Sequence, residues 1–345
     1  MSTNYGFRIY ETKTYKQVSS SDDINKYGVG DIYNCTTLYN SQIVVFMFNN
    51  KEKRNGVFFF DDGRKTKIGC VVMTEEIEKF FVSHKIFALF PKNKSKVLLF
   101  EMKTLKYITT VNDVYKHSLN HAENLKTERN KITLAHISSL NKNYIKIIVY
   151  LTNDKSGTIS KKMTMSINTN FNAIQTLELL SDFIIVSSSC GNKIHLYSLK
   201  DFSLMYCLFL GNFAYELGNF SVDKKNKFLM LSTNNKYIKM FKLKDLKENN
   251  EDICSCDDHD DDEVDHNPRK SISFFLQKML VDTTQMHCRY RYDSKVDNLA
   301  MFDPERDDKF NIIESNGEVK VVNFNRKKSG SAELEKNIKW NEEMN

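Results

Sequence analysis

The 345-residue sequence has little proline, glycine or tryptophan: three Pro, twelve Gly and one Trp. This composition excludes a collagen-like or Gly/Pro-rich low-complexity chain. No apolar run reaches the roughly 20 residues that a membrane-spanning helix needs, and the amino terminus lacks the apolar core of a secretory signal. Seven scattered cysteines favour reduced thiols in the cytoplasm over a disulfide framework. Any membrane contact is therefore expected to be peripheral.

Aromatic residues and segregated charge are what the sequence does have. It contains 24 Phe and 16 Tyr, and 41% of it is hydrophobic, which supplies strand-forming residues and a sizeable core. The formal charge is +6, but nine of the 44 acids lie within residues 251–265, so Lys and Arg exceed acids by 15 elsewhere. Such a basic body suits an anionic membrane or a nucleic acid. Ordinary solvated faces in a lysine-rich protein are the alternative interpretation.

The stretch Asp182–Leu243 contains the same unit twice. Each copy has an apolar run, a Ser/Thr cluster, a short turn, and an alternating strand that ends in an aromatic residue, Tyr197 or Phe241. These two aromatics lie 44 residues apart, which is the period of a four-stranded propeller blade. Because one such sheet cannot bury both of its faces, several must stack around an axis.

Similar units recur before this stretch, with strands such as Gln42–Phe48 and Val97–Phe100, and after it, where the last unit ends at Phe324. About seven can be counted, although the unit over residues 132–167 is the least regular. The sequence therefore predicts an all-β, seven-bladed β-propeller that resembles WD40 proteins. Its expected bounds are residues 1–325, with an acidic and amphipathic loop insertion at 247–288 and a flexible charged tail at 326–345.

Hydroxyl clusters at the ends of the two repeated strands are candidate anion sites. Hydroxyls can donate to phosphate oxygens, and a cation one strand away can balance the charge. A purely structural role for Ser and Thr at strand ends is the alternative. The candidate residues are Ser188, Ser189 and His195 in the first copy, and Ser232, Thr233 and Lys239 in the second.

An apolar segment, Ser271–Leu280, follows the acidic run within the predicted insertion. Its apolar side chains recur at helical spacing and form a broad face. A short apolar helix on a long loop suits insertion into a bilayer interface, whereas packing against the side of the propeller is the alternative. The candidate insertion residues are Ile272, Phe274, Phe275, Leu276, Met279 and Leu280.

Other chemistries find little support. The spacing of Cys254, Cys256, His259 and His266 matches no zinc module, so no metal is expected. There is no catalytic triad, Gly-rich phosphate loop or poised carboxylate pair, so neither an enzyme nor a cofactor is predicted. A groove-fitting helix or base-stacking motif is also missing beside the basic charge, which argues against nucleic acid. A monomer is expected.

Taken together and in order, the motifs resemble the PROPPINs, a family of seven-bladed propellers that bind phosphatidylinositol 3-phosphate and related lipids during autophagy. Tyr5–Thr12 is similar to the family's opening NGFRIYNT, and Phe60–Gly69 to its WDD…K.IGEL. Ser188–Tyr197 and Leu231–Phe241 resemble the strands that carry its two headgroup sites. The resemblance covers nearly the whole chain and implies that the two hydroxyl clusters are phosphoinositide sites.

One departure from the family pattern concerns its Phe-Arg-Arg-Gly signature, in which one arginine serves each headgroup. Here the corresponding place contains Leu208, Phe209, Leu210 and Gly211, with no arginine. Because losing a charge-assisted phosphate contact costs about 1.5–3 kcal/mol, lipid affinity should be weakened. The acidic run beside the insertion segment would also repel anionic lipid.

The resemblance implies a peripheral protein that binds phosphatidylinositol 3-phosphate or 3,5-bisphosphate and recruits autophagy scaffold proteins. Its expected location is the cytoplasm, peripherally on vacuolar, endosomal or pre-autophagosomal membranes. The alternative is a lipid-independent protein–protein scaffold in autophagy or vesicle trafficking. The sequence leaves open which branch of the family it resembles, which partners it carries and what the acidic run does.

Overall fold

The fold is described from a computed structural model. The described residues are 7–10, 17–21, 32–38, 41–48, 54–115, 118, 120–124, 130–153, 158–180, 182–211, 214–233, 237–243, 286–292, 298–314 and 318–339. These residues contain 27 strands and no α-helix, which confirms the all-β prediction. Segments with alternating apolar residues and segments with continuous apolar runs both form strands. Because side chains alternate between the two faces of a strand, the first kind can bury one face and the second kind can bury both.

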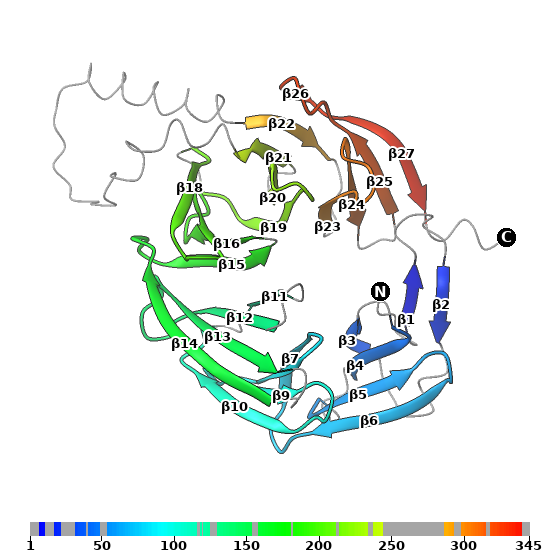
Figure 1. The fold of residues 1–345 in the computed structure, drawn as a ribbon. Helices are drawn as coiled ribbons and strands as arrows, with labels where there is room; N and C mark the ends of the chain where they lie inside the picture. Colours follow the sequence, from blue (N-terminus) through cyan, green and yellow to red (C-terminus); the bar gives the residue numbers. More distant parts are fainter. Residues whose placement is uncertain are drawn as a thin grey trace. The chain divides into compact units, whose positions relative to one another are not determined.

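The strands form seven sheets, whose neighbours follow chain order except where the C-terminal strands join (Figure 1). The first three sheets are β1 (Phe7–Tyr10) and β2 (Gln17–Ser21); β3 (Ile32–Thr37), β4 (Ile43–Phe48), β5 (Gly56–Asp61) and β6 (Thr66–Val72); and β7 (Ile77–Val82), β8 (Ile86–Pro91), β9 (Lys96–Glu101) and β10 (Tyr107–Asn112). The fourth and fifth are β11 (Asn120–Asn124), β12 (Asn130–Ile137), β13 (Tyr144–Asn153) and β14 (Thr158–Asn168); and β15 (Ile174–Leu180), β16 (Phe183–Ser188), β17 (Lys193–Ser198) and β18 (Leu204–Phe209). The last two are β19 (Leu217–Val222), β20 (Phe228–Thr233), β21 (Tyr237–Lys242), β22 (Met286–Arg291) and β26 (Gly330–Ser331); and β23 (Asn298–Phe302), β24 (Lys309–Glu314), β25 (Glu318–Asn323) and β27 (Glu333–Lys339).

Seven sheets match the number of repeating units in the sequence, although the first has only two described strands. Each of the other six has four or five. The second strands β8, β16 and β20 are buried along their whole length, whereas β6, the last strand of its sheet, is largely exposed. A continuous apolar run therefore marks the strand that is covered on both faces.

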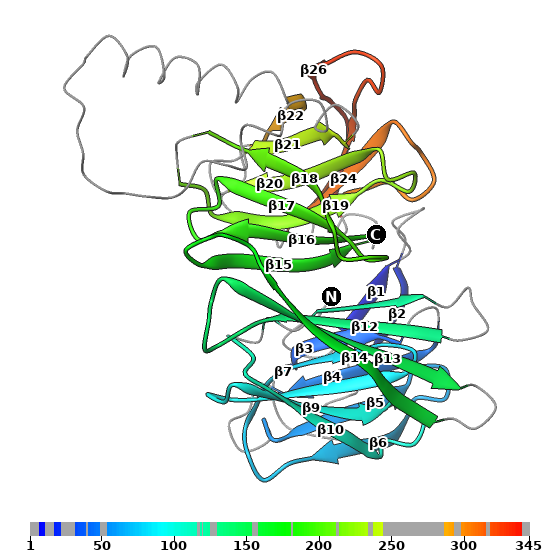
Figure 2. The same cartoon turned by 60° about the vertical axis from the view of Figure 1, so that its left-hand side comes forward.

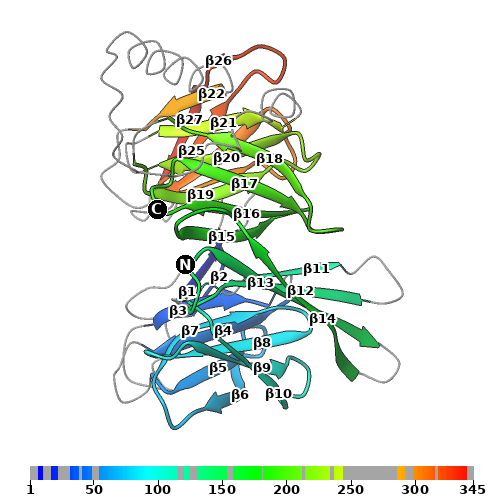
Figure 3. The ribbon, with the colours of Figure 1, turned by 90° about the vertical axis from the view of Figure 1, so that its left-hand side faces the viewer.

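The chain divides into two compact units, each with its own hydrophobic core. Unit 1 comprises residues 1–119, 123–140 and 148–164, and unit 2 comprises residues 120–122, 141–147 and 165–345. In unit 1, the sheets β3–β6 and β7–β10 lie side by side and share a core that includes Val45, Phe59 and Phe87 (Figure 2). In unit 2, β15–β18 and β19–β22 pack against each other (Figure 3).

The prediction of a flexible tail over residues 326–345 is wrong for residues 330–331 and 333–339, which form strands. Residues Glu333–Lys339 form β27, which pairs antiparallel with β25 and completes its sheet. Gly330 and Ser331 form β26, which pairs in parallel with β22. The charged side chains lie on exposed positions of β27, so their polarity reflects an outer strand of a sheet rather than the absence of structure.

Candidate functional site

The two repeated hairpins of unit 2 place the predicted site residues in equivalent positions. His195 on β17 is paired with Val186 on β16, so it shares a face of the sheet with Ser188, two residues further along. Lys239 on β21 is paired with Leu231 on β20 and shares a face with Thr233 in the same way. Ser232 lies on the opposite face of β20. The structure therefore brings together two pairs of candidates and separates Ser232 from them.

The Ser188 hydroxyl is occupied within its own turn. Ser188 is 6% exposed; its Oγ donates to Asn192 Oδ1 at 2.9 Å and accepts a hydrogen bond from the backbone N–H of Lys193 at 3.1 Å. These bonds stabilise the β16–β17 turn, as Ser does in many turns. Ser189 is exposed at the same turn. Of these two hydroxyls, only that of Ser189 is readily reached by a solute.

Ser232 and Thr233 are also buried and bonded, each being 2% exposed. Ser232 Oγ donates to Asn219 Oδ1 and accepts from the Asn219 backbone N–H, both at 3.0 Å. The Asn219 side chain in turn exchanges hydrogen bonds with the backbone of Ala300 on β23. Ser232 thus stabilises the link between two sheets. Thr233 Oγ1 donates to the carbonyl of Tyr237 at 2.9 Å and closes the β20–β21 turn.

His195 is a neutral aromatic side chain rather than a cation near neutral pH. Its ring packs on Phe171 with centroids 4.3 Å apart, and Nδ1 lies 3.3 Å from the Tyr197 hydroxyl. Burial, assisted by the nearby charge of Lys193, lowers the pKa of His195 from 6.5 to about 4, because both disfavour the protonated ring. His195 therefore contributes no positive charge to an anion site at physiological pH.

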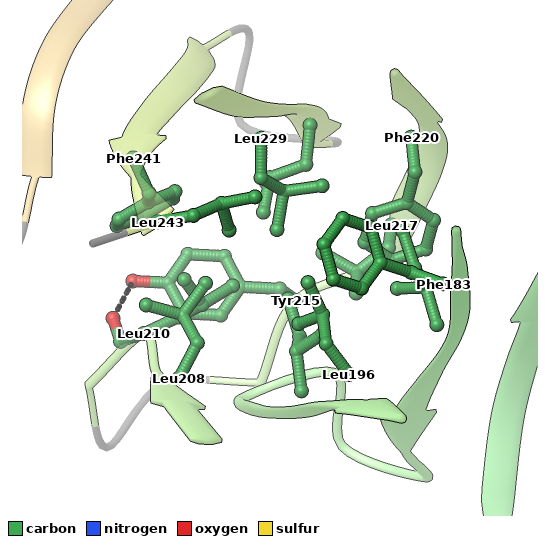
Figure 4. Packing of buried hydrophobic residues seen from close by; sticks show 13 residues of the cluster. Phe183, Leu196, Leu208, Leu210, Tyr215, Leu217, Phe220, Leu229, Phe241 and Leu243 are labelled. Atoms are coloured by element: carbon green, nitrogen blue, oxygen red, sulfur yellow. Dashed lines mark hydrogen bonds between the residues drawn. The ribbon is translucent and has the colours of Figure 1, made fainter. Parts of the chain in front are cut away.

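Lys239 occupies the equivalent position in the next sheet and keeps its amine beside an aromatic ring. Nζ lies 4.5 Å from the ring centroid of Tyr215 and donates to the Tyr215 hydroxyl at 3.3 Å. Tyr215 is 5% exposed, and its hydroxyl donates to the carbonyl of Leu210 at 3.0 Å (Figure 4). The buried tyrosine thus holds the half-buried lysine in place by cation–π and hydrogen-bond contacts.

The degenerate signature forms part of the core between two sheets. Leu208 and Leu210 are 1% and 0% exposed and pack with Tyr215, Leu217 and Leu243 (Figure 4). Phe209 is 9% exposed. Gly211 is buried with φ of 107°, a conformation that favours glycine. In this chain the segment stabilises the fold through apolar packing. An arginine side chain at residue 210 would place its charge in the core rather than in solvent.

The predicted membrane-insertion segment lies within residues 244–285, which are outside the described residues. They include the proposed insertion residues Ile272, Phe274, Phe275, Leu276, Met279 and Leu280. In the described part of the chain, no helix has the length and apolar character of a membrane span.

The state of the cysteines differs in part from the expectation of reduced thiols. Cys207 is disulfide-bonded, whereas Cys35, Cys70, Cys190 and Cys288 are free.

Sequence reasoning missed the position of Arg289 and Arg291 beside Lys239. Arg289 is directly opposite Lys239 across the β21–β22 pair, and Arg291 is opposite Tyr237. Both arginines are exposed. The alternation Arg-Tyr-Arg could have suggested that the arginines share a face. Their proximity to Lys239, which lies 50 positions before Arg289 and 52 before Arg291, could not be read from the sequence.

A second polar cluster in unit 1 was also missed. It lies where the sheets β3–β6 and β7–β10 meet, and we call it the basic edge. The Arg54 guanidinium lies 4.7 Å from the ring centroid of Tyr33 and 3.5 Å from Glu76 Oε1. Lys92 Nζ contacts Glu76 Oε2 at 2.8 Å, and this hydrogen bond holds the pKa of Glu76 below its ordinary value.

Two more lysines complete the basic edge through the neighbouring carboxylate. Lys94 Nζ and Lys96 Nζ lie 4.0 Å and 3.8 Å from Glu75 Oε1. Four cations thus surround two carboxylates, beside the 45% exposed Tyr33. The net positive charge and the exposed aromatic ring are features of protein-binding surfaces. The members of the basic edge are Tyr33, Arg54, Glu75, Glu76, Lys92, Lys94 and Lys96.

Comparison with known proteins gives a likeness of fold and none of sequence. No model of a known family and no curated protein matches this chain. Hsv2 of Kluyveromyces lactis, solved with its complete loop 6CD, matches with a TM-score of 0.70 and 13% identity, covering 98% of this chain and 94% of that one. Hsv2 of Kluyveromyces marxianus matches with a TM-score of 0.65 and 12% identity, covering 97% and 92% of the two chains.

A third solved structure contains a protein partner. KlAtg21, solved in complex with the coiled coil of AgAtg16, matches with a TM-score of 0.68 and 13% identity over 97% of this chain and 93% of that one. Identities this low carry the fold and not the binding residues. Hsv2 and Atg21 are propellers of the family that the sequence motifs resemble, so the predicted architecture is confirmed. This chain therefore has the WD40-like β-propeller fold of the PROPPIN proteins Hsv2 and Atg21.

Proposed function

We propose that this chain is a non-enzymatic propeller adaptor that brings protein factors of autophagy or vesicle trafficking to phosphoinositide-bearing membranes. Vacuolar, endosomal or pre-autophagosomal membranes are the expected locations, as the PROPPIN resemblance implies. The basic edge of unit 1 is the observation that best supports this function. It offers four cations for two carboxylates, and its lysines are partly or largely exposed: Lys92 42%, Lys94 52% and Lys96 34% by side chain.

An acidic helical partner fits this edge. Carboxylates spaced along a helix would face several lysines at once, which steers encounter and fixes register. The exposed ring of Tyr33 adds an apolar contact of the kind that anchors interfaces. A coiled coil is a helical ligand, and KlAtg21 has been solved with one. We infer that the protein-binding half of the function resides here.

The test measures binding of the AgAtg16 coiled coil to the full chain by calorimetry. Lys94→Glu with Lys96→Glu should weaken binding by tenfold or more, because attraction becomes repulsion at two positions. Lys103→Glu with Lys106→Glu is the matched control, since these exposed lysines follow the opposite end of β9 in the same sheet. Equal binding by both double variants, or no coiled-coil binding at all, would contradict the assignment.

Phosphoinositide recognition is the second half of the proposed function. Lys239 supports it, because its amine is held beside Tyr215 on the same face as Thr233. Buried, bonded hydroxyls and a neutral His195 argue for weak affinity and for one headgroup region in the β19–β22 sheet. Liposome flotation with phosphatidylinositol 3-phosphate tests this, and binding that is absent or indifferent to the 3-phosphate would exclude it.

A further inference from the structure

The turn between β8 and β9 carries a serine among lysines. Lysines occupy the positions three and one before Ser95 and the position directly after it. The turn is tight, with Asn93 at a φ of 56°, which asparagine tolerates. Its backbone is held on both sides, because the Lys92 N–H donates to the Glu76 carbonyl at 2.8 Å and the Ser95 carbonyl accepts from the Val114 N–H at 3.0 Å. The turn therefore presents its side chains from a fixed frame.

The Ser95 hydroxyl is accessible and has no internal task. Ser95 is exposed, and among the described residues its Oγ has no hydrogen-bond partner. Ser83 in the preceding turn is the opposite case: its buried Oγ donates to the Ile86 carbonyl and accepts from the Ile86 N–H, both at 2.9 Å. A reaction at Ser95 Oγ thus breaks no bond of the fold.

The three lysines around this serine share two carboxylates. Lys94 Nζ and Lys96 Nζ lie 4.0 Å and 3.8 Å from Glu75 Oε1, and Lys92 Nζ lies 2.8 Å from Glu76 Oε2. Three lysines against two carboxylates leave a formal excess of one positive charge. Because the two pairs to Glu75 are long and partly exposed, they contribute little to stability, and their lysines can turn to a stronger acceptor.

We propose that Ser95 is a phosphorylation site for a protein kinase that selects basic substrates, and that its phosphorylation prevents the basic edge from binding an acidic partner. Lysines at the −3, −1 and +1 positions offer the charge pattern that the acidic substrate cleft of such a kinase recognises. Ser95 Oγ forms a bond to the γ-phosphorus of ATP, the bond from that phosphorus to the β–γ bridging oxygen breaks, ADP leaves, and the hydroxyl proton passes to the catalytic aspartate of the kinase.

The added phosphate reverses the local charge. A phosphoserine carries about −1.5 to −2 charges at pH 7 and has three strong acceptor oxygens. Combined with the excess of one positive charge, it leaves the turn with about 0.5 to 1 negative charge. Lys94 and Lys96, its neighbours in sequence, then donate to the phosphate rather than to an incoming carboxylate. An acidic helix meets repulsion where it previously met attraction.

This inference rests on the protein-binding half of the proposed function, whose regulation it supplies, and is independent of the lipid half. The turn contributes three of the lysines of the basic edge, so a charge change at Ser95 acts where the partner is expected to bind. No rearrangement of the sheets is needed, since the modified side chain is already exposed.

The first experiment treats the full chain with ATP and the catalytic fragment of protein kinase C, and locates phosphate by mass spectrometry of peptides. Incorporation at Ser95 is expected, and Ser95→Ala should lose it. Ser329, an exposed serine of unit 2 that directly follows three basic residues, is the matched reference for kinase activity on this chain. Failure to modify Ser95, whether or not Ser329 is modified, overturns the proposal.

The second experiment measures binding of the AgAtg16 coiled coil by calorimetry before and after kinase treatment. Phosphorylated wild type should bind about tenfold or more weakly, treated Ser95→Ala as the untreated wild type does, and treated Ser329→Ala as weakly as the treated wild type. Unchanged affinity after phosphorylation of Ser95, with Lys94→Glu and Lys96→Glu still weakening binding, overturns the regulation and leaves the basic edge intact. Absence of binding by the untreated chain overturns the protein-binding half and its regulation together.

Discussion

Adjacent sheets of unit 2 have the same strand pattern but differ in how many cations they carry at equivalent positions. In β15–β18, His195 is paired with Cys207, and Lys193 with Phe209. In β19–β22, the equivalent pairs are Lys239 with Arg289, and Tyr237 with Arg291. The first set of pairs has one cation, Lys193, among neutral and largely apolar side chains, whereas the second set has three cations, two of which contact tyrosine rings.

The difference shows that a repeated backbone does not repeat its chemistry. Position 195 packs on Phe171, and burial keeps its imidazole uncharged. Position 239 packs on Tyr215, whose hydroxyl accepts from the amine. In both sheets an aromatic residue lies before the first strand. Only Tyr215, which has a hydroxyl group, contacts a charged side chain, that of Lys239. His195 and Lys239 therefore occupy equivalent positions in the two sheets, but only the region of Lys239 offers a positive charge to an anion.

The largest expected effect comes from restoring an arginine to the apolar segment between the sheets. Leu210→Arg should lower the free energy of unfolding by at least about 3 kcal/mol, because it buries an unpaired charge in the core. Leu204→Arg, at a 44% exposed position of β18, the strand that directly precedes Leu210, should stay within about 0.5 kcal/mol of wild type. Urea denaturation measures the free energy of unfolding of both variants. A stability of Leu210→Arg close to that of the wild type would contradict the structural role given to this apolar segment.

The second prediction uses pH to separate the two sheets. The folded pKa of His195, about 4, lies below its ordinary value of 6.5, so the unfolded chain binds more protons between these values. Stability should therefore fall as pH drops from 6.5 towards 4, by up to about 3 kcal/mol from this residue. His195→Phe should remove that part of the pH dependence. Urea titrations at pH 7 and 4.5 measure the free energy of unfolding. An equal loss of stability between these pH values in the variant and the wild type would contradict the prediction.

Third in size is the loss of the sheet-linking hydroxyl. Ser232→Ala should cost about 1–3 kcal/mol, since Asn219 loses two hydrogen bonds in a buried setting. Ser189→Ala, at an exposed hydroxyl of the neighbouring sheet, should cost less than about 0.5 kcal/mol. Thermal or urea unfolding distinguishes the two, and equal effects would show that Ser232 has no structural role.

The smallest effect concerns the cationic pair itself. Arg289→Gln should raise the stability of the ligand-free protein by a few tenths of a kcal/mol, because it removes a like charge opposite Lys239. The gain should shrink as added salt screens the repulsion. Urea midpoints at low and high salt measure it. A loss of stability that is independent of salt would mean that the two cations are not in repulsive contact.

Much of the fold could be predicted from local pattern. The buried second strands β16 and β20 and the aromatic ends of β17 and β21 follow directly from apolar runs and alternation. The tail was misassigned because β27 has an exposed, charged strand pattern and depends on β25 for its hydrogen bonds. An outer strand with few apolar residues gives no periodic signal of its own.

The candidate site was predicted only in part. Ser188, His195, Thr233 and Lys239 do share faces of the two sheets, as their spacing suggests. Whether a hydroxyl is available is decided by partners such as Asn192 and Asn219, and whether His195 carries charge is decided by burial. Neither can be read from residue type.

The sequence alone determined the strands, their repeat of 44 residues and the all-β class, because side-chain alternation is a local property of the chain. Only the tertiary structure decided which hydroxyls are used internally and which cations meet. Arg289 and Ser331 reach Lys239 through strand pairing across 50 and 92 positions of sequence, and such long-range pairs depend on how whole sheets assemble.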